Sequence, residues 1–188
     1  MKTSRRNHFF LLIFTLMTSL TLCNSVMAED ESNDVVPRLK ASKHKLIDGI
    51  GQAEKGNGTA ISAKFEVEDG KLLLSVYAAK EGRNKDAEHN TLIELNGDAT
   101  TAQWTPEIEV FADKEHLTRA AMQLTVAQLS KRSLGEVVAT AIATQPGEVY
   151  SVIPAIKNDN AIFVVKIAKA DGKSVELNID AKTAQVTK

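Results

Sequence analysis

The ten residues 94–103 recur as residues 176–185, and this repeat constrains the fold more than any other feature of the chain. The segments Glu-Leu-Asn-Gly-Asp-Ala-Thr-Thr-Ala-Gln and Glu-Leu-Asn-Ile-Asp-Ala-Lys-Thr-Ala-Gln agree at eight of ten positions. Self-similarity on this scale indicates one structural unit that occurs twice. We therefore expect two small units rather than one medium-sized domain.

A hairpin pattern precedes each repeat. Residues 61–67 alternate apolar and polar side chains, as in a half-buried strand, and Asp69-Gly70 then predicts a type I′ turn. With a two-residue loop, each inward residue meets another: Val67 with Leu72, Phe65 with Leu74, Ala63 with Val76, and Ile61 with Ala78. The same pattern recurs 89 residues later around Asn158-Asp159, where Pro154 predicts that its strand lies at a sheet edge or carries a bulge.

The offset of the third strand is 82, so the first copy contains seven extra residues, which we place in the polar stretch 80–90. A short helix is predicted before each hairpin, with these inward residues: Leu46, Ile50 and Ala53 in the first; Leu134, Val137, Val138, Ala141 and Ile142 in the second. Ser133 and Glu136 form a capping-box pattern. Gly49 and Gly51 should make the first helix the weaker one, since each costs about 1 kcal/mol relative to Ala.

Between the copies, residues 108–111 are expected to extend the first sheet. Asp113 is expected to cap a further helix. The inward residues of that helix should be Leu117, Ala120, Ala121 and Leu124.

The chain resembles a tandem of PepSY domains over residues 41–188. The resemblance rests on Ser133-Leu134, Pro146-Gly147, residues 163–167, Asp171-Gly172 and residues 180–183. It implies an α+β fold of two tandem copies, 41–112 and 113–188, each a helix packed on a small antiparallel β-sheet. It also implies a role in restraining peptidases, and no active site. The chain departs from the family at Ala102 and Ala184, where Gly is usual, and at residues 56–58, which replace Pro-Gly.

Residues 1–28 have the zones of a secretory signal: Lys2, Arg5 and Arg6, an apolar stretch at 9–22, and small residues before a cleavage site after Ala28. The apolar stretch is shorter than the roughly 20 residues that span a bilayer. We therefore expect a periplasmic or secreted protein with no permanent membrane span in its mature form. Residues 29–40 are expected to form a flexible leader. Lipidation at Cys23 is the alternative, although Leu22 fits a lipoprotein site poorly.

Charge and motifs exclude several classes of function. Residues 29–188 carry 20 Lys and Arg against 24 Asp and Glu, a net charge of −4, which does not favour nucleic acid. We find no His-Glu-x-x-His, Gly-x-Ser-x-Gly or phosphate-loop motif. The sequence accordingly predicts no catalytic, cofactor-binding or metal site and no cofactor. The three histidines after residue 28, His44, His89 and His116, are expected at the solvated surface.

Asp98 and Asp180 recur beside a threonine, and we interpret both as turn-forming residues. Trp104 either fills the junction between the copies or marks a binding surface. We expect a non-enzymatic module that binds another exported protein, such as a peptidase, through a sheet edge near Pro154. The alternatives are a small-ligand or cation-binding envelope protein that uses the cleft between the copies, and an enzyme with a dispersed site.

Overall fold

The computed structural model describes residues 32–56 and 58–187. The expected signal peptide with Cys23, and the first residues of the expected leader, lie outside the described residues. The helices are α1 (Ser32–Arg38), η1 (Leu39–Ala41), α2 (Leu46–Gly56), η2 (Ala87–His89), α3 (Lys114–Leu129) and α4 (Leu134–Thr144). The strands are β1 (Thr59–Glu68), β2 (Lys71–Ala79), β3 (Leu92–Asp98), β4 (Glu107–Val110), β5 (Glu148–Lys157), β6 (Asn160–Ala168), β7 (Ser174–Asp180) and β8 (Val186–Thr187). None of the helices in this part of the chain has the length and apolarity needed to cross a membrane.

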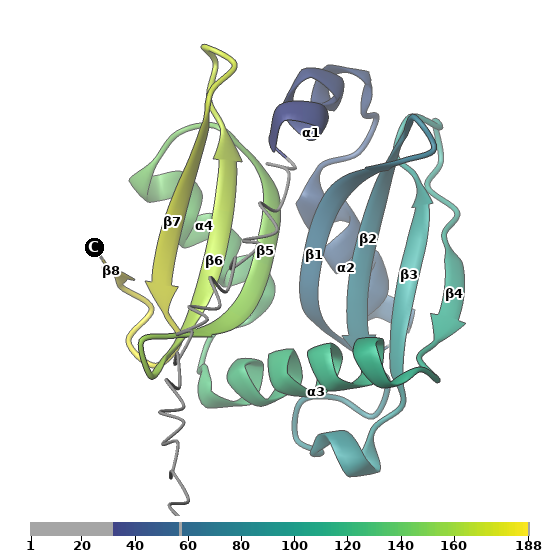
Figure 1. Ribbon diagram of the computed structural model, residues 1–188, viewed down its shortest axis with the longest axis vertical. Coiled ribbons are helices and arrows are strands. Elements are labelled where there is room, and N and C mark those ends of the chain that lie inside the picture. Colours follow the sequence, from purple (N-terminus) through teal and green to yellow (C-terminus); the bar gives the residue numbers. More distant parts are fainter. Residues whose placement is uncertain (1–31, 57, 188) are drawn as a thin grey trace, which may run out of the picture.

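The eight strands form one antiparallel sheet in the order β4-β3-β2-β1-β5-β6-β7-β8 (Figure 1). We call β4-β3-β2-β1 the first half-sheet and β5-β6-β7-β8 the second half-sheet. β1 and β5 join them through the pairs Ala63↔Val152 and Lys64↔Ser151. The expected combination of helices with antiparallel sheet is confirmed, but the expectation of two separate small sheets is wrong, because the β1–β5 pairing joins all eight strands into one.

The hairpins β1–β2 and β5–β6 have the two-residue turns that the sequence predicts. Asp69 and Gly70 both have positive φ angles, 49° and 75°, and so do Asn158 and Asp159, 50° and 61°. Positive φ at both central residues is the backbone of a type I′ turn. The predicted pairs Val67–Leu72, Phe65–Leu74 and Ala63–Val76 are present.

A β-bulge makes one predicted pair wrong. The register of β1 shifts between Ala60 and Ser62, so Ala60 rather than Ile61 lies opposite Ala78. A bulge adds one residue to a strand and interrupts its alternation. Ile61 is therefore buried on the opposite side of the sheet from Ala63. Strict alternation of side chains from Val67 would have placed both residues on the same side.

The expectation that the strand of Pro154 lies at a sheet edge is also wrong. β5 lies in the interior of the sheet between β1 and β6, and the edges are β4 and β8. The other alternative is confirmed, because β5 carries a register shift between Val149 and Ser151, although not at Pro154 itself. The pairing of β5 with β1 ends at Val152, so Pro154 lies where β5 has no ladder partner on its β1 side. A residue without an N–H can be accommodated there.

Helices α2 and α4 cover the rear face of the sheet as it is seen in Figure 1. Every predicted inward residue of the two helices except Ile142 is buried, and Ile142 is 45% exposed. These residues share one continuous core with residues from both half-sheets, among them Phe65, Leu74, Phe163 and Val165. Ser133 and Glu136 form the predicted capping box at the start of α4. The two sequence copies therefore bury their apolar faces together.

Helix α3 crosses the lower part of the front face in Figure 1. Asp113 caps it as predicted, and accepts hydrogen bonds from the backbone N–H groups of its first turn. Ala120 and Leu124 pack on Ile61 of the first half-sheet. Leu117, which the helical pattern placed inward, is exposed. α3 follows the expected domain boundary at residue 112 and contacts strands of both half-sheets, β1 and β3 as well as β5 and β6.

The loop 80–91, which contains the seven extra residues of the first copy, lies against the C-terminal end of α3. Arg83 donates hydrogen bonds to the backbone oxygens of Ala127, Ser130 and Arg132. The last carbonyls of a helix have no partner within it. This loop therefore supplies hydrogen-bond donors to the C-terminal end of α3.

Residues 32–40 were expected to belong to a flexible leader, and the structure corrects this. They lie in α1 and η1, and Val35 and Leu39 are buried in the core of the rear face. Arg38 donates a hydrogen bond to the backbone oxygen of Gly70 in the β1–β2 turn at 3.0 Å. Val35 and Leu39, the partly buried Val36 and the Arg38 hydrogen bond together anchor this segment.

Candidate functional site

Strand β4 is one of the two outer strands of the sheet and lies at its right-hand edge in Figure 1. All four of its residues are exposed. Ile108 and Val110 are 53% and 54% exposed, although each lies opposite a fully buried residue of β3. An edge strand with exposed apolar side chains can pair with another chain. This edge is the candidate site.

The phase of the β3–β4 ladder shows which backbone groups of β4 are free. The N–H of Phe111 donates to the C=O of Leu92 at 3.0 Å. Hydrogen-bonded residues alternate along an antiparallel strand, so Glu109 and Glu107 also direct their backbone groups toward β3. The N–H and C=O groups of Ile108 and Val110 therefore point away from the sheet, toward an added strand.

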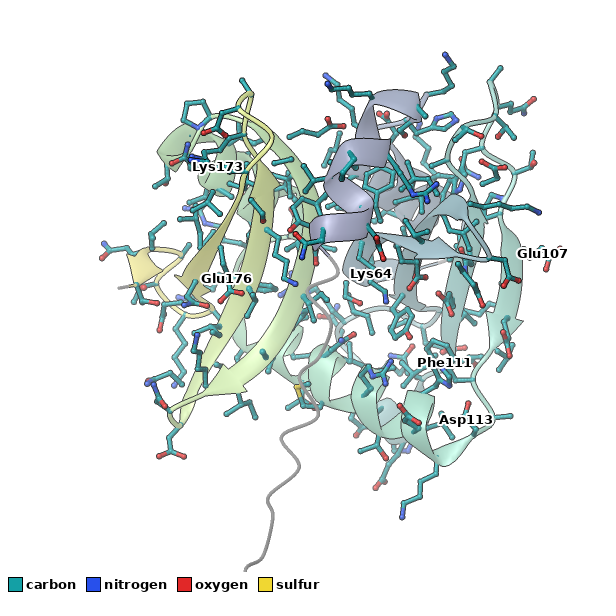
Figure 2. The ribbon with its side chains drawn as sticks, turned by 45° about the horizontal axis from the view of Figure 1, so that its top comes forward. Lys64, Glu107, Phe111, Asp113, Lys173 and Glu176 are labelled. Carbon is teal, nitrogen blue, oxygen red and sulfur yellow. The ribbon has the colours of Figure 1, made fainter. Side chains whose placement is uncertain are left out.

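Acidic side chains line the front side of this edge. Glu109 lies directly opposite Glu94, and Glu107 lies opposite Asn96. Figure 2 shows Glu107 at the outer edge of the molecule, far from Glu176 of the second half-sheet. A hollow of about 730 Å³ lies over these strands, and its charged lining residues are Glu68, Lys71, Glu94, Asp98, Glu107 and Glu109. Like charges on neighbouring strands repel, so this surface favours a cationic partner.

Glu94 is a half-buried acid of this surface. Burial raises the pKa of its carboxyl, and the nearby Glu66 carboxylate raises it further. The Ser75 hydroxyl donates to its Oε1 at 2.5 Å, and this hydrogen bond acts in the opposite direction, together with the charges of Lys64 and His116. The net effect raises the pKa, so Glu94 in the folded protein keeps its proton more readily than a solvated glutamate does.

Aromatic contacts fix the end of β4 to the rest of the fold. The Phe111 ring meets the Tyr77 ring edge to face at 4.7 Å between centroids, and it stacks on the His116 ring at 5.3 Å. His116 Nδ1 lies 2.6 Å from Asp113 Oδ2. Phe111 and Asp113 lie at the start of α3 in Figure 2. The edge strand is therefore held between β3 and α3, and its backbone groups have a defined direction.

The opposite edge, β8, is shorter. It consists of Val186 and Thr187, which pair with Ile179 and Asn178. The Thr187 hydroxyl also donates to the backbone oxygen of Asn178 at 3.3 Å. Two residues offer less backbone to an added strand than the four of β4, so β8 is the weaker candidate.

Asp98 and Asp180 make the hydrogen bonds that a turn-forming role requires. Asp98 Oδ1 accepts from the N–H and the hydroxyl of Thr100, at 2.8 and 2.6 Å. Asp180 Oδ1 accepts from the N–H groups of Lys182 and Thr183, at 3.0 and 2.7 Å. These hydrogen bonds lower the pKa of both carboxyls. Each carboxylate holds its own turn closed.

Trp104 is buried, but it does not lie between the copies as one interpretation proposed. Its Nε1 lies 2.8 Å from the place that a Cβ would occupy on Gly97 of β3. Its backbone oxygen accepts a hydrogen bond from Gln52 of α2 at 3.4 Å. The junction of the half-sheets is the β1–β5 pair, two strands away from β3. Trp104 belongs to the shared core and packs there against β3 and α2 of the first half-sheet.

The three histidines lie on separate segments. His44 precedes α2 and its Nε2 lies 2.8 Å from the backbone oxygen of Thr101, whereas His89 pairs with Asp86 in η2 at 2.6 Å. Across residues 32–56 and 58–187, no group of three or more His, Cys, Asp or Glu side chains is placed to hold a metal ion.

A second hollow, of about 490 Å³, lies between α2 and α4, and it is mostly apolar. Ile47 and Ile142, both half-exposed, contribute to its lining. Lys45 of the first copy and Glu148 of the second are its charged residues. Burial raises the pKa of the Glu148 carboxyl, and Lys45 opposes this. The hollow brings charges from both copies to one concave surface, which the small-ligand alternative requires.

Sequence reasoning expected residues 108–111 to extend the sheet but did not identify β4 as its acidic edge. A signal was present, because Glu107, Ile108, Glu109 and Val110 alternate acidic and apolar side chains. Such a strand has one charged side and one apolar side. The order of the strands, and therefore which strand lies at the edge of the sheet, cannot be predicted from this pattern.

Comparisons with known proteins give little further information. No protein-family model matches the chain, and no curated protein matches it. A solved structure of a candidate lipoprotein from Clostridium difficile 630 is similar at 18% identity and a TM-score of 0.39, and the match covers 78% of this chain and 92% of that chain. A similarity at this TM-score supports no inference about the fold or the function of this chain.

Proposed function

We propose that this chain is a non-enzymatic exported module that binds another protein by accepting an extended segment along β4. The exposed edge carries the proposal, because the backbone groups of Ile108 and Val110 point away from β3. Main-chain hydrogen bonds from such an edge are a recurrent means of peptide recognition. The zones of residues 1–28 support export to the periplasm or the exterior.

The proposal includes a tandem PepSY-type duplication. The strand β5 follows β1 by 89 residues and β6 follows β2 by the same number, whereas β7 follows β3 by 82. The register shifts of β1 and β5 also lie 89 residues apart. These correspondences support the proposal, and the resemblance to PepSY domains makes an exported peptidase the first partner to test.

The alternative is an envelope protein that binds a small ligand between α2 and α4. It is favoured by the apolar hollow in which Lys45 and Glu148 meet. An amphiphilic ligand would place its apolar part against Ile47 and Ile142 and its polar part at the two charges. Binding of such a ligand would be unaffected by changes in β4.

Capture from envelope extracts with two matched variants tests the proposal. Ile108→Pro removes an N–H that points away from β3, and Val186→Pro places the same residue in the other edge strand. We expect the unmodified protein and Val186→Pro to capture one common partner and Ile108→Pro to lose it. Thermal unfolding of all three proteins controls for folding.

Two results would contradict the proposal. One is the capture of the same partner by folded Ile108→Pro. The other is the absence of any partner after gentle cross-linking, together with calorimetric binding of a small amphiphile that Ile142→Glu abolishes. The second result would favour the alternative.

A further inference from the structure

The two sides of β4 differ in chemistry, and this difference restricts what can pair with it. Glu107 and Glu109 lie on the front side together with Glu94 of β3. Ile108 and Val110 lie on the other side and are about half exposed. Side chains of an added strand alternate in the same way, so each would meet either the acidic side or the apolar side of β4.

We propose that the segment bound at β4 is an extended basic segment of a partner protein, in which Lys or Arg alternates with apolar residues. This inference rests on the proposed function and names the partner's chemistry. Its basic residues lie opposite Glu107 and Glu109, and its apolar residues lie beside Ile108 and Val110. Opposite charges in directly facing positions stabilise strand pairing, whereas like charges oppose it.

The same geometry disfavours a second copy of this chain as the occupant. Two β4 strands paired antiparallel about a two-fold axis would share their front side. Glu107 and Glu109 of one copy would then face the same two acids of the other. An acidic segment from any other protein meets the same repulsion.

The hollow beside β4 extends the acidic side beyond the strand itself. Glu68 and Asp98 belong to its lining, and Lys71 is its one basic lining residue. A long Lys or Arg side chain can reach across a neighbouring strand to such groups. The excess of acid is therefore available to the basic residues of the bound segment.

Synthetic peptides of matched length test the inference with the mature protein. The probes are a Lys-Val alternating peptide, a Thr-Val alternating peptide, a Glu-Val alternating peptide, and a Lys-Val peptide of the same composition with the alternation scrambled. Fluorescence anisotropy gives each Kd at two salt concentrations, and hydrogen exchange reports the amides of Ile108 and Val110.

We expect the alternating basic peptide to bind tightest and to protect both amides. The double change Glu107→Gln with Glu109→Gln should weaken it by about tenfold, the sum of two cross-strand charge pairs. Glu176→Gln, a change of the same kind in β7, should leave Kd unaltered. Binding should weaken as salt is added.

Separate outcomes address the two proposals. If the neutral peptide binds as tightly as the basic one and Ile108→Pro abolishes both, edge pairing stands and the basic-segment inference is overturned. Equal binding of the scrambled basic peptide also overturns it, because charge without alternation would then suffice. If no peptide protects the amides of Ile108 and Val110, the inference and the proposed function fail together.

Discussion

The two half-sheets have the same plan but differ at their outer strands. Each has a hairpin with a two-residue turn, a register shift near the start of its first strand, and a third strand with an Asp-closed turn. Asn96 and Asn178, at corresponding positions, each have a buried amide oxygen without a hydrogen-bond partner in the described structure. A feature present in both halves belongs to the scaffold, so a binding role is better sought where they differ.

The differences are concentrated in the first half-sheet. Its outer strand has four residues rather than two, and it is acidic on one side. Gly97 makes room for Trp104, whereas Ile179 and Val186 occupy the corresponding positions of the second half-sheet. The comparison shows that the first half-sheet offers the longer and more acidic outer strand.

The largest expected effect tests whether the half-sheets unfold together. Phe163 in the second half-sheet is buried in the shared core, and Phe163→Ala should cost about 3–5 kcal/mol of unfolding free energy. Trp104, the single tryptophan of the chain, reports on the first half-sheet. In urea, its fluorescence transition should shift together with the circular dichroism signal. A tryptophan transition that does not move would show two independently folded domains.

The next prediction places the core pair of the second half-sheet, Ile and Val, at the corresponding positions of the first. Gly97→Ile places a side chain against the Trp104 indole and the Pro106 backbone, and overpacking of this kind costs about 1–3 kcal/mol. Adding Trp104→Val recreates the pair found at Ile179 and Val186 and should recover part of the loss. A double-mutant cycle from urea unfolding measures the coupling. Strictly additive effects would mean that the two positions are not equivalent.

Two glycines of α2 provide a smaller, matched test. A Cβ on Gly51 meets nothing within 4 Å, so Gly51→Ala should stabilise the fold by about 1 kcal/mol. A Cβ on Gly49 would lie 2.7 Å from the Leu74 side chain. Gly49→Ala should therefore lower the melting temperature in spite of the better helix propensity. Equal stabilisation by both changes would contradict close packing of α2 on β2.

The smallest effect concerns pH. Glu94 has a raised pKa, so its contribution favours folding below the ordinary glutamate pKa and is lost as the pH rises through the raised value. The groups around it include Glu66, Lys64, Ser75 and His116, together with Tyr77 and Glu109, which face it from the two neighbouring strands.

Glu94→Gln should accordingly raise the melting temperature slightly at neutral pH and leave it unchanged at low pH. Glu176→Gln, at the corresponding position of the second half-sheet, should have little effect at either pH. A neutral-pH loss of stability in Glu94→Gln would show that the carboxylate is favourably paired.

Much of the scaffold followed from local patterns in the sequence. The alternation around Asp69-Gly70 and Asn158-Asp159 gave the hairpins and most of their pairing, and the capping residues Asp113 and Ser133 gave two helix starts. These features depend on neighbouring residues alone. The bulge at Ile61 and the burial of Val35 do not follow from neighbouring residues. The bulge results from one extra residue in β1, and Val35 is buried by contacts with residues distant in the sequence.

The candidate site could not be located from the sequence because strand order is a property of the whole sheet. Pro154 suggested an edge, but the pairing of β1 with β5 placed its strand in the interior. The same pairing left β4 and β8 as the outer strands. The acidic and apolar alternation of residues 107–110 acquires its significance only once that order is known.

Site-specific photo-cross-linking tests the central claim most directly, since it asks which edge of the sheet meets a partner. A photoreactive amino acid would replace Ile108 in β4 in one protein and Val186 in β8 in another, each expressed in the native host. We predict a defined cross-linked product from position 108, to a basic alternating segment of another exported protein, and none from position 186. Products from position 186 alone, or from neither position while one forms at Ile142 between α2 and α4, would contradict the claim.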